Sequence, residues 1–392
     1  MRQEYQCVIK EEIEIIFGRS IVSQRDCMDL SAEIFQKIHK QINVNTLRRF
    51  FGLIKSDYFP SHVTLNILSE YCGFQSAEEA YQIRQTANLP ELNVHDNMVH
   101  YFISIFDKIT VYDRCDKTFL TLVEQTIMFM NRHLGLVNKF HSLIAKTKNG
   151  QEYYFEQFVN VDKFNLYYKD GLRHYLMEKR SNEATIFAHS VMVFNYWLNN
   201  SDVKLEEHYN QLVKFSPSGY LNGYIYCRYY AAILFNCYRE ERPVEDILVT
   251  LYKYYISLEA AAEADQLFYF EYVISEALVL TGHYNDAQFY IGRFFLRSAK
   301  IGFCNQKMSL QNIKLYKTIA LNKTGETAEA LNVFNSIKPA EFHFTSKNYA
   351  AILYTHLTTK LKKKVCDYKE SYDALINQTG FTRLRDLFPI CY

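Results

Sequence analysis

The chain has 392 residues, of which 48% are hydrophobic and 22% charged, and its formal net charge is +1. This composition is typical of a globular protein with ample material for a core, and the length predicts two or more domains. No apolar run approaches the roughly 18 residues of a membrane-spanning helix, and the N-terminus is acidic where a secretory signal would be basic. We therefore expect no membrane association and a cytoplasmic location.

The nine cysteines are scattered along the chain and never form a Cys-x-x-Cys pair. An odd number at irregular spacing indicates neither a disulfide framework nor a zinc site. The sequence therefore predicts buried thiols in a reducing compartment, and no metal ion or cofactor.

Four short helical patterns follow one another between residues 29 and 80. In the third pattern, apolar residues recur at i, i+3, i+4 and i+7, which predicts one buried helix face. That face comprises Leu47, Phe50, Phe51 and Ile54. The opposite face would present Asn45, Arg48, Arg49 and Gly52. Asn can bond adenine bidentately and Arg can bond guanine, so this face suits the reading of nucleic acid.

Residues with capping chemistry separate these patterns. We expect Asp29 or Ser31 to cap the second helix and Asn43 or Asn45 the third. Pro60-Ser61 should open the fourth, Gly73 should end it, and Ser76 with Glu79 should make a capping box for the fifth.

The run PSHVTLNILSEYCGFQSAEEA (60–80) resembles the final helices of the lambda-repressor/Cro-type DNA-binding domain. The resemblance implies a second helix at about 30–39 and a recognition helix at about 43–54. It implies Asn43, Asn45, Thr46, Arg48 and Arg49 as the reading residues. The turn HKQIN lacks the family's usual glycine, and Leu30-Ser31-Ala32 stands where the family often has a DNA-contacting Gln.

Charge qualifies this interpretation, because residues 1–90 carry ten Lys or Arg against eleven Asp or Glu. Between residues 34 and 56, however, there are five basic residues and no acid. We therefore add Lys37, Lys40 and Lys55 to the predicted DNA-binding set, with double-stranded DNA as the partner. The alternative is a helical docking module that kept this fold without the ligand.

Pro90, in TANLPELN, interrupts the periodicity and predicts a boundary between a domain at 1–90 and a second at 91–392. Residues 91–180 read as mostly helical, with a turn expected at Asn149-Gly150. From about residue 180, paired helical patterns start near 182, 221, 261, 305 and 344. A repeat of this length is typical of stacked helical hairpins.

Two phrases in this array, LTGHYNDAQFYIGRFF (280–295) and KTGETAEALNVFNSIKP (323–339), resemble the second half of a tetratricopeptide repeat. The matching positions are Gly282, Tyr284 and Ala287 in the first, and Gly325, Ala330 and Phe334 in the second. The family's first-helix Trp and Leu-Gly positions are not matched, and the period is longer. The predicted fold is all-α: an N-terminal helix-turn-helix bundle followed by a right-handed, tetratricopeptide-like solenoid.

Tyrosine is concentrated in YLNGYIYCRYYAAILFNCY (220–238). One interpretation is a concave groove for a peptide, because Tyr gives rigid contact area and Asn can hold a peptide backbone. The groove residues would be Tyr226, Arg228, Tyr229 and Asn236. The alternative is that the same residues fill the seams between helices. The basic run at 360–364 reads as a solvated helix end.

The sequence contains no phosphate loop, nucleophile elbow, His-Glu-x-x-His or dinucleotide-binding motif, so we expect no enzyme. The layout is similar to that of bacterial peptide-pheromone receptors that act as transcription factors. That likeness implies a peptide-responsive DNA-binding regulator, commonly a homodimer. The alternative function is a non-enzymatic interaction scaffold whose N-terminal unit serves docking or dimerisation.

Overall fold

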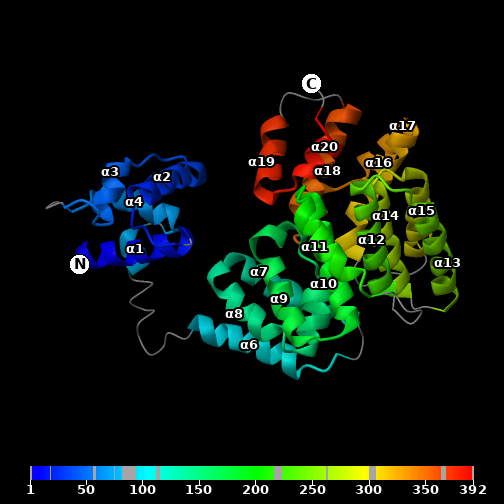
Figure 1. Ribbon diagram of the computed structural model, residues 1–392, viewed down its shortest axis with the longest axis horizontal. Helices are drawn as coiled ribbons and strands as arrows, with labels where there is room; N and C mark the ends of the chain where they lie inside the picture. The colour runs from blue at the N-terminus through cyan, green and yellow to red at the C-terminus, as the bar shows by residue number, and fades with distance from the viewer. Residues whose placement is uncertain are drawn as a thin grey trace. The chain divides into compact units, whose positions relative to one another are not determined.

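The computed structural model describes residues 2–17, 19–55, 59–74, 76–81, 94–111, 115–215, 223–261, 264–299, 306–362 and 368–390. Within these ranges the chain forms helices and no strands, so the predicted all-α class is confirmed. The chain divides into two compact units, residues 1–98 and 99–392 (Figure 1). The boundary predicted at 86–93 lies outside the described residues.

The first unit contains α1 (Arg2–Phe17), α2 (Gln24–Ile38), α3 (Val44–Phe50) and α4 (His62–Tyr71), and a short helical segment at 77–81. The apolar faces of all four helices meet in one core, to which α2 contributes Leu30 and Ile34, and α3 contributes Leu47 and Phe50.

Helix α2 begins earlier than the expected residue 30, so the expectation that Asp29 or Ser31 caps it was wrong. Ser23 accepts a hydrogen bond from the Asp26 N–H and the Asp26 carboxylate accepts from the Ser23 N–H, which makes a capping box. Asp29 instead pairs with Arg19 (2.7 Å). The Ser31 hydroxyl donates to the carbonyl of Ile42 (2.7 Å), which ties α2 to the segment before α3.

Helix α3 ends before the expected residue 54, and the reason is Gly52. Its φ of +80° lies in the left-handed region, and the Leu53 N–H turns back to the Arg48 carbonyl (2.8 Å). Ile54 therefore does not extend the apolar stripe of α3. The caps expected from Asn43, Ser61 and Gly73 are confirmed.

The second unit opens with helices that surround a stretch of unusual helical geometry. They are α6 (Val94–Lys108, which begins before the unit boundary), α7 (Lys117–Arg132), α8 (Leu134–Ile144), the π-helices η1 (Gly150–Gln157) and η3 (Phe164–Tyr168), the 3-10 turn η2 (Val161–Lys163) and α9 (Lys169–Glu178). The turn expected at Asn149-Gly150 is wrong, because the backbone there is helical and the break falls at 145–147. The Asn149 amide instead donates to the carbonyls of Phe106 (2.8 Å) and Ile109 (2.7 Å).

Five helical hairpins follow. Their first helices are α10 (Asn182–Leu198), α12 (Gly223–Arg239), α14 (Ala264–Leu280), α16 (Gln306–Thr324) and α18 (Lys347–Lys362). Their second helices are α11 (Asp202–Leu212), α13 (Glu245–Ala261), α15 (Tyr284–Ser298), α17 (Thr327–Asn335) and α19 (Lys369–Thr379). The short helices η4 (Pro339–Glu341) and α20 (Thr382–Leu387) complete the unit.

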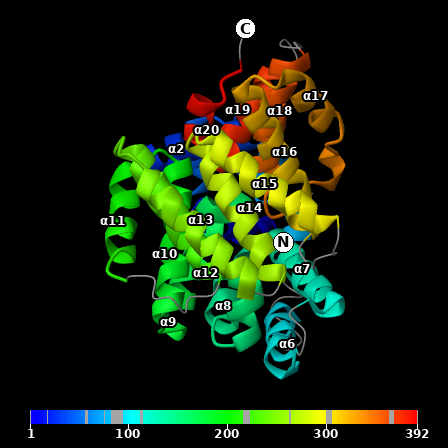
Figure 2. The same ribbon diagram turned by 90° about the vertical axis from the view of Figure 1, so that its right-hand side faces the viewer.

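The hairpins recur with an almost constant period. Their first helices start 41, 41, 42 and 41 residues apart, within three residues of each predicted start. The first helices contact one another in chain order. Figure 1 shows α13, α15 and α17 on one side of α12, α14 and α16, and Figure 2 shows α13, α14 and α15 side by side.

Small residues hold the hairpins together where the sequence predicts them. Gly282 has φ +86° at the end of α14, and the His283 N–H returns to the Leu278 carbonyl (2.8 Å). Ala287 and Ala330, which follow Gly282 and Gly325 by five residues, are fully buried in α15 and α17. Each alanine therefore lets the second helix approach its neighbours closely.

The last helices of the chain also contact segments that lie much earlier in the second unit. The Asp162 carboxylate accepts hydrogen bonds from the N–H groups of Asn348 (2.7 Å) and Tyr349 (3.0 Å), at the start of α18. Arg383 of α20 donates to the Trp197 carbonyl (2.6 Å) and to the Asp202 carboxylate (2.9 Å). The array is thus joined to itself across about half the chain, which we did not expect from the sequence.

Among the described residues, no helix is both long and apolar enough to cross a membrane. Over the same ranges, no three His, Cys, Asp or Glu side chains gather as a metal-binding group. Cys27, Cys227 and Cys237 are buried thiols without disulfides.

Candidate functional site

The segment between α2 and α3 sets the position of α3. His39 ends α2 with φ 54°, and its N–H bonds the Phe35 carbonyl (3.0 Å). Four residues later the Asn43 side chain caps α3 by accepting from the Asn45 N–H (2.8 Å). Leu47 and Phe50 are buried in the core, so the opposite side of α3 faces outward.

The eight predicted DNA-binding residues differ in their surroundings. Asn43, Asn45, Arg49 and Lys55 are exposed, as are Lys37 and Lys40, whereas Thr46 and Arg48 are half-buried. The Arg48 Nη1 donates to the Asn45 side chain (3.1 Å), and its Nε is buried without a hydrogen-bond partner in the described part of the chain. Arg48 is therefore partly structural, which the pattern of the helix did not indicate.

Two of the lysines also have intramolecular partners. Lys40 pairs with Glu70 (2.5 Å), and the Lys37 ammonium lies 4.6 Å from the centre of the Tyr71 ring. No ion pair within the described ranges involves Arg49 or Lys55. These two are the cations of the set that remain available to a ligand.

Acidic side chains of the first unit are held by its own donors. Glu14 accepts from the Ile21 N–H (2.9 Å), and Glu33 accepts from the Tyr71 hydroxyl. The Ser23 hydroxyl lowers the pKa of Asp26, and burial followed by Glu33 raises the pKa of Tyr71. These contacts hold three acids of α1 and α2 within the unit, and no ion pair among the described residues joins an acid to Arg49.

The predicted peptide-groove residues are all buried, and Arg228 faces a different neighbour from Tyr226. The Tyr226 ring stacks on Tyr254 of α13, with centroids 3.4 Å apart, and Tyr229 meets Tyr230. Arg228, which is only 7% exposed, donates from Nε and Nη2 to the Tyr269 hydroxyl of α14. A helix turns by about 100° per residue, so positions 226 and 228 face different neighbours. Tyr226 and Tyr229 are buried, and Tyr226 packs against a neighbouring helix as the alternative predicts, while the peptide groove itself stays a prediction.

Asn236, the fourth groove residue, is fully buried, and its amide makes no hydrogen bond within the described residues beyond a weaker interaction with Glu240. Asn195 occupies the position 41 residues earlier, in α10, and is also fully buried. Its Oδ1 accepts from Asn199 (3.0 Å), while its Nδ2 has no partner in the described ranges. Two equivalent buried amides therefore recur in adjacent hairpins. Their spacing of 41 residues equals the period of the repeat, so the sequence alone could have shown that they occupy matching positions.

Sequence reasoning missed a polar network on the first helices. The Tyr316 hydroxyl donates to Glu276 (2.5 Å), and the Asn312 amide contacts the Tyr272 hydroxyl (3.1 Å) and Ser346 (3.2 Å). Burial raises the pKa of Glu276, and the charge of Arg228 opposes that rise. Hydrogen bonds of this network link α14, α16 and the residue before α18 without any ligand, and the charge of Arg228 on α12 acts on the same Glu276.

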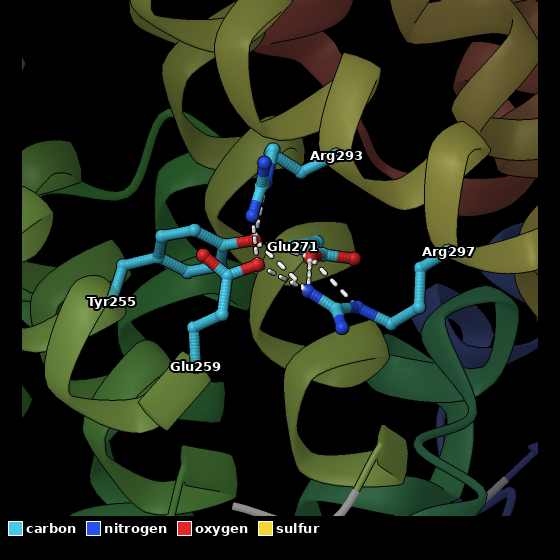
Figure 3. Close-up of polar contacts among 5 residues, drawn as sticks. All are labelled: Tyr255, Glu259, Glu271, Arg293 and Arg297. Carbon is cyan, nitrogen blue, oxygen red and sulfur yellow. Dashed lines mark hydrogen bonds and ion pairs between the residues drawn. The ribbon is translucent and has the colours of Figure 1, made fainter. Parts of the chain in front are cut away.

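A second missed cluster joins α13, α14 and α15 (Figure 3). Tyr255 donates to Glu271 (2.7 Å), and Arg297 contacts both Glu271 (3.0 Å) and Glu259 (3.1 Å). Arg293 pairs with Glu259 as well. Burial and then the Glu271 charge raise the pKa of Tyr255 to about 12. Burial also raises the pKa of Glu271, against the hydrogen bonds from Tyr255 and Arg297. The charges of the two arginines and the two carboxylates balance, so the cluster holds α13, α14 and α15 together.

Comparisons with protein-family models, curated proteins and solved structures gave no match to this chain. These comparisons therefore assign no ligand or activity to the candidate site, and its geometry alone indicates what it could bind.

Proposed function

We propose that the protein is a DNA-binding transcriptional regulator whose helical-hairpin array, of tetratricopeptide-like kind, receives a peptide or another ligand. The observation that supports DNA binding best is α3, a short capped helix with Asn45 and Arg49 exposed on its outer side. Lys55 follows it, and the sequence has no acid between residues 34 and 56. Such a helix can enter a major groove, where Asn and Arg read base edges and Lys holds phosphate.

The buried amides of Asn195 and Asn236 support the ligand-responsive part of the proposal. Buried polar atoms without a hydrogen-bond partner, such as the Asn195 Nδ2 within the described residues, are uncommon, and a bound peptide backbone offers both donors and acceptors. A ligand that bonded them would favour the arrangement of α10 and α12 in which they are accessible.

Titration of duplex DNA with the full-length protein at several salt concentrations tests the first part. We expect binding that weakens steeply as salt rises, because phosphate contacts release counterions. The double variant Arg49→Ala/Lys55→Ala should lose at least about tenfold in affinity and lower the salt slope by about 1, because Lys55 is the phosphate contact of the pair. Neither side chain is buried, so the melting temperature should stay within about 2 °C.

Arg25→Ala is the matched control, since Arg25 is an exposed cation in the first turn of α2. Unchanged affinity in the double variant, or an equal loss in the control, would contradict reading by α3. Arg48 is unsuitable for this test, because its buried Nε makes any replacement a change of stability as well.

The second candidate function is an interaction scaffold whose first unit docks to a protein. Met28 and Phe35 favour it, because they lie seven residues apart on α2 and are more than half exposed. Absence of DNA binding by the wild-type protein at low salt would favour this function.

A further inference from the structure

A cleft opens at one edge of the array, where the turns of the first three hairpins meet α20. Its volume of about 440 Å³ is within the range of small-molecule sites. It is lined by the first residue of α11, the end of α12 and the turn after it, the residue before α15, and one residue of α20. No part of this turn cleft belongs to the predicted DNA-binding or peptide-binding sets.

Glu241, which lines the turn cleft, has a backbone conformation that its residue type disfavours. Its φ of +52° lies in the left-handed region, where residues other than glycine and asparagine are uncommon. The positions 41 residues earlier and later also have positive φ, and they are Asn200 and Gly282, which tolerate it. Glutamate therefore costs folding stability at this position of the repeat. A strained residue that lines a cleft indicates a role in binding.

The carboxylate of Glu241 is free to bind a ligand. The side chain is exposed, and no ion pair within the described residues involves it. Its neighbour Glu240, by contrast, pairs with both Arg239 and Arg242. An unpaired carboxylate in a cleft suits a ligand that carries an ammonium group.

Two arginines of the turn cleft converge on Asp202. Arg239 of α12 donates to its carbonyl (3.4 Å), and Arg383 of α20 donates to its carboxylate (2.9 Å). Each guanidinium keeps a donor, because the Arg239 Nε is buried without a partner in the described ranges and no hydrogen bond there involves the Arg383 Nη1. A buried donor without an acceptor is costly, so the two arginines suit a ligand that carries a carboxylate.

The charges of the arginines are offset within the protein, which decides between kinds of ligand. The pairs are Asp202–Arg383 (2.9 Å), Glu206–Arg239 (3.0 Å) and Glu240–Arg242 (2.5 Å). A phosphate would therefore find little net positive charge, and it would meet the unpaired carboxylate of Glu241. A zwitterion has no net charge and offers one group to the free donors and one to that carboxylate.

We propose that the turn cleft binds a free amino acid with an apolar side chain. The carboxylate of the ligand accepts from Arg239 and Arg383, and its ammonium group donates to Glu241. Tyr238 and Val244 also line the cleft, and they provide the apolar surface that the ligand side chain contacts. The bound amino acid joins the turn after α12 to α20, so it stabilises the second unit. This inference does not depend on DNA binding or on a peptide ligand.

Calorimetric titration of the full-length protein with each common amino acid tests the proposal. We expect a Kd of about 1 mM or tighter for at least one amino acid with an apolar side chain, and a melting temperature that rises with its concentration. The deaminated analogue of that ligand keeps only the carboxylate, and the decarboxylated analogue keeps only the ammonium group. Each should bind at least about tenfold more weakly, because it loses a charged hydrogen bond. Binding of phosphate without binding of any amino acid, or binding of neither, would overturn the proposal.

Glu241→Gly separates binding from folding. Glycine should raise the melting temperature of the free protein by about 2 °C, because it adopts positive φ without strain. It should also weaken amino-acid binding at least about tenfold, because the carboxylate is lost. Misfolding cannot produce that combination. The control Glu207→Gln alters an exposed acid of α11 that does not line the cleft, and it should leave the affinity unchanged. Amino-acid binding that Glu241→Gly leaves intact would overturn the proposal.

Discussion

Buried histidines are the residues whose charge state most clearly depends on the fold. His141 is almost fully buried, with its Nε2 2.9 Å from the Tyr154 hydroxyl, and burial followed by the charge of His174 lowers its pKa to about 3. Burial lowers the pKa of His189 and of His356 to about 4. The folded protein therefore keeps these imidazoles neutral where the unfolded chain, with a pKa near 6.5, takes up protons.

We predict that stability falls as the pH is lowered from about 7 toward 4. In this window the unfolded state binds more protons than the folded state at these three histidines, so their contribution to the free energy of unfolding rises with pH and is complete above about pH 7. Urea unfolding at pH 7.5 and at 5.5 measures the slope. His356→Leu should flatten it, although the variant also loses the contact to the Pro389 carbonyl. An identical slope in the variant would show that His356 does not contribute.

At the scale of single helices, the sequence predicted three helix ends of the first unit and missed two others. Asn43, Ser61 and Gly73 act as expected because capping depends on neighbouring backbone atoms alone. The start of α2 was missed because Ser23 and Asp26 precede the segment that carries the family resemblance. The end of α3 was missed because Gly52 was assigned to a helix face, although its positive φ ends the helix.

Gly282 offers a test, in the array, of how a glycine with positive φ ends a helix. Alanine there would have to adopt φ +86°, although its Cβ would meet no atom within 4 Å, so the cost is backbone strain alone. Gly282→Ala should lower the free energy of unfolding by about 1 kcal/mol. Gly282→Asn should recover part of the loss, since Asn tolerates the left-handed region. Chemical denaturation of the three proteins measures both effects, and equal stability of the two variants would contradict this explanation.

At the scale of the whole molecule, the sequence predicted the repeats but not the contacts that join their ends. The period is visible because each hairpin repeats a local pattern, whereas the Asp162–Asn348 and Arg383–Trp197 contacts each join residues 186 apart. The candidate site shows the same limit: exposed Asn45 and Arg49 followed from helix geometry, but the burial of Arg48 depends on how α3 packs against the rest of its unit.

We predict that Arg383 couples the first and last hairpins. Arg383→Ala should cost about 2 kcal/mol, since it removes charged hydrogen bonds to the Trp197 carbonyl and to Asp202. It should also let α18 exchange amide hydrogens faster than α10, because an array joined only in sequence can open from one end. Hydrogen-exchange mass spectrometry compares the two helices directly.

Arg385→Ala is the control for this coupling. Arg385 also lies on α20, but it contacts only nearby Asn377 and Asp373 among the described residues. Its replacement should leave the exchange of α10 and α18 equal. Faster exchange in the control than in Arg383→Ala would assign the coupling to α20 as a whole.

The reactivity of the buried thiols can report the local unfolding of each unit. Only a thiolate attacks an alkylating reagent, and burial raises the pKa of Cys227, in α12, to about 12. Burial likewise raises the pKa of Cys27, in α2. Both thiols are therefore unreactive toward the reagent in the native fold and become reactive when their own unit unfolds. Because Cys27 lies in the first unit and Cys227 in the second, the order in which they are labelled shows which unit opens first.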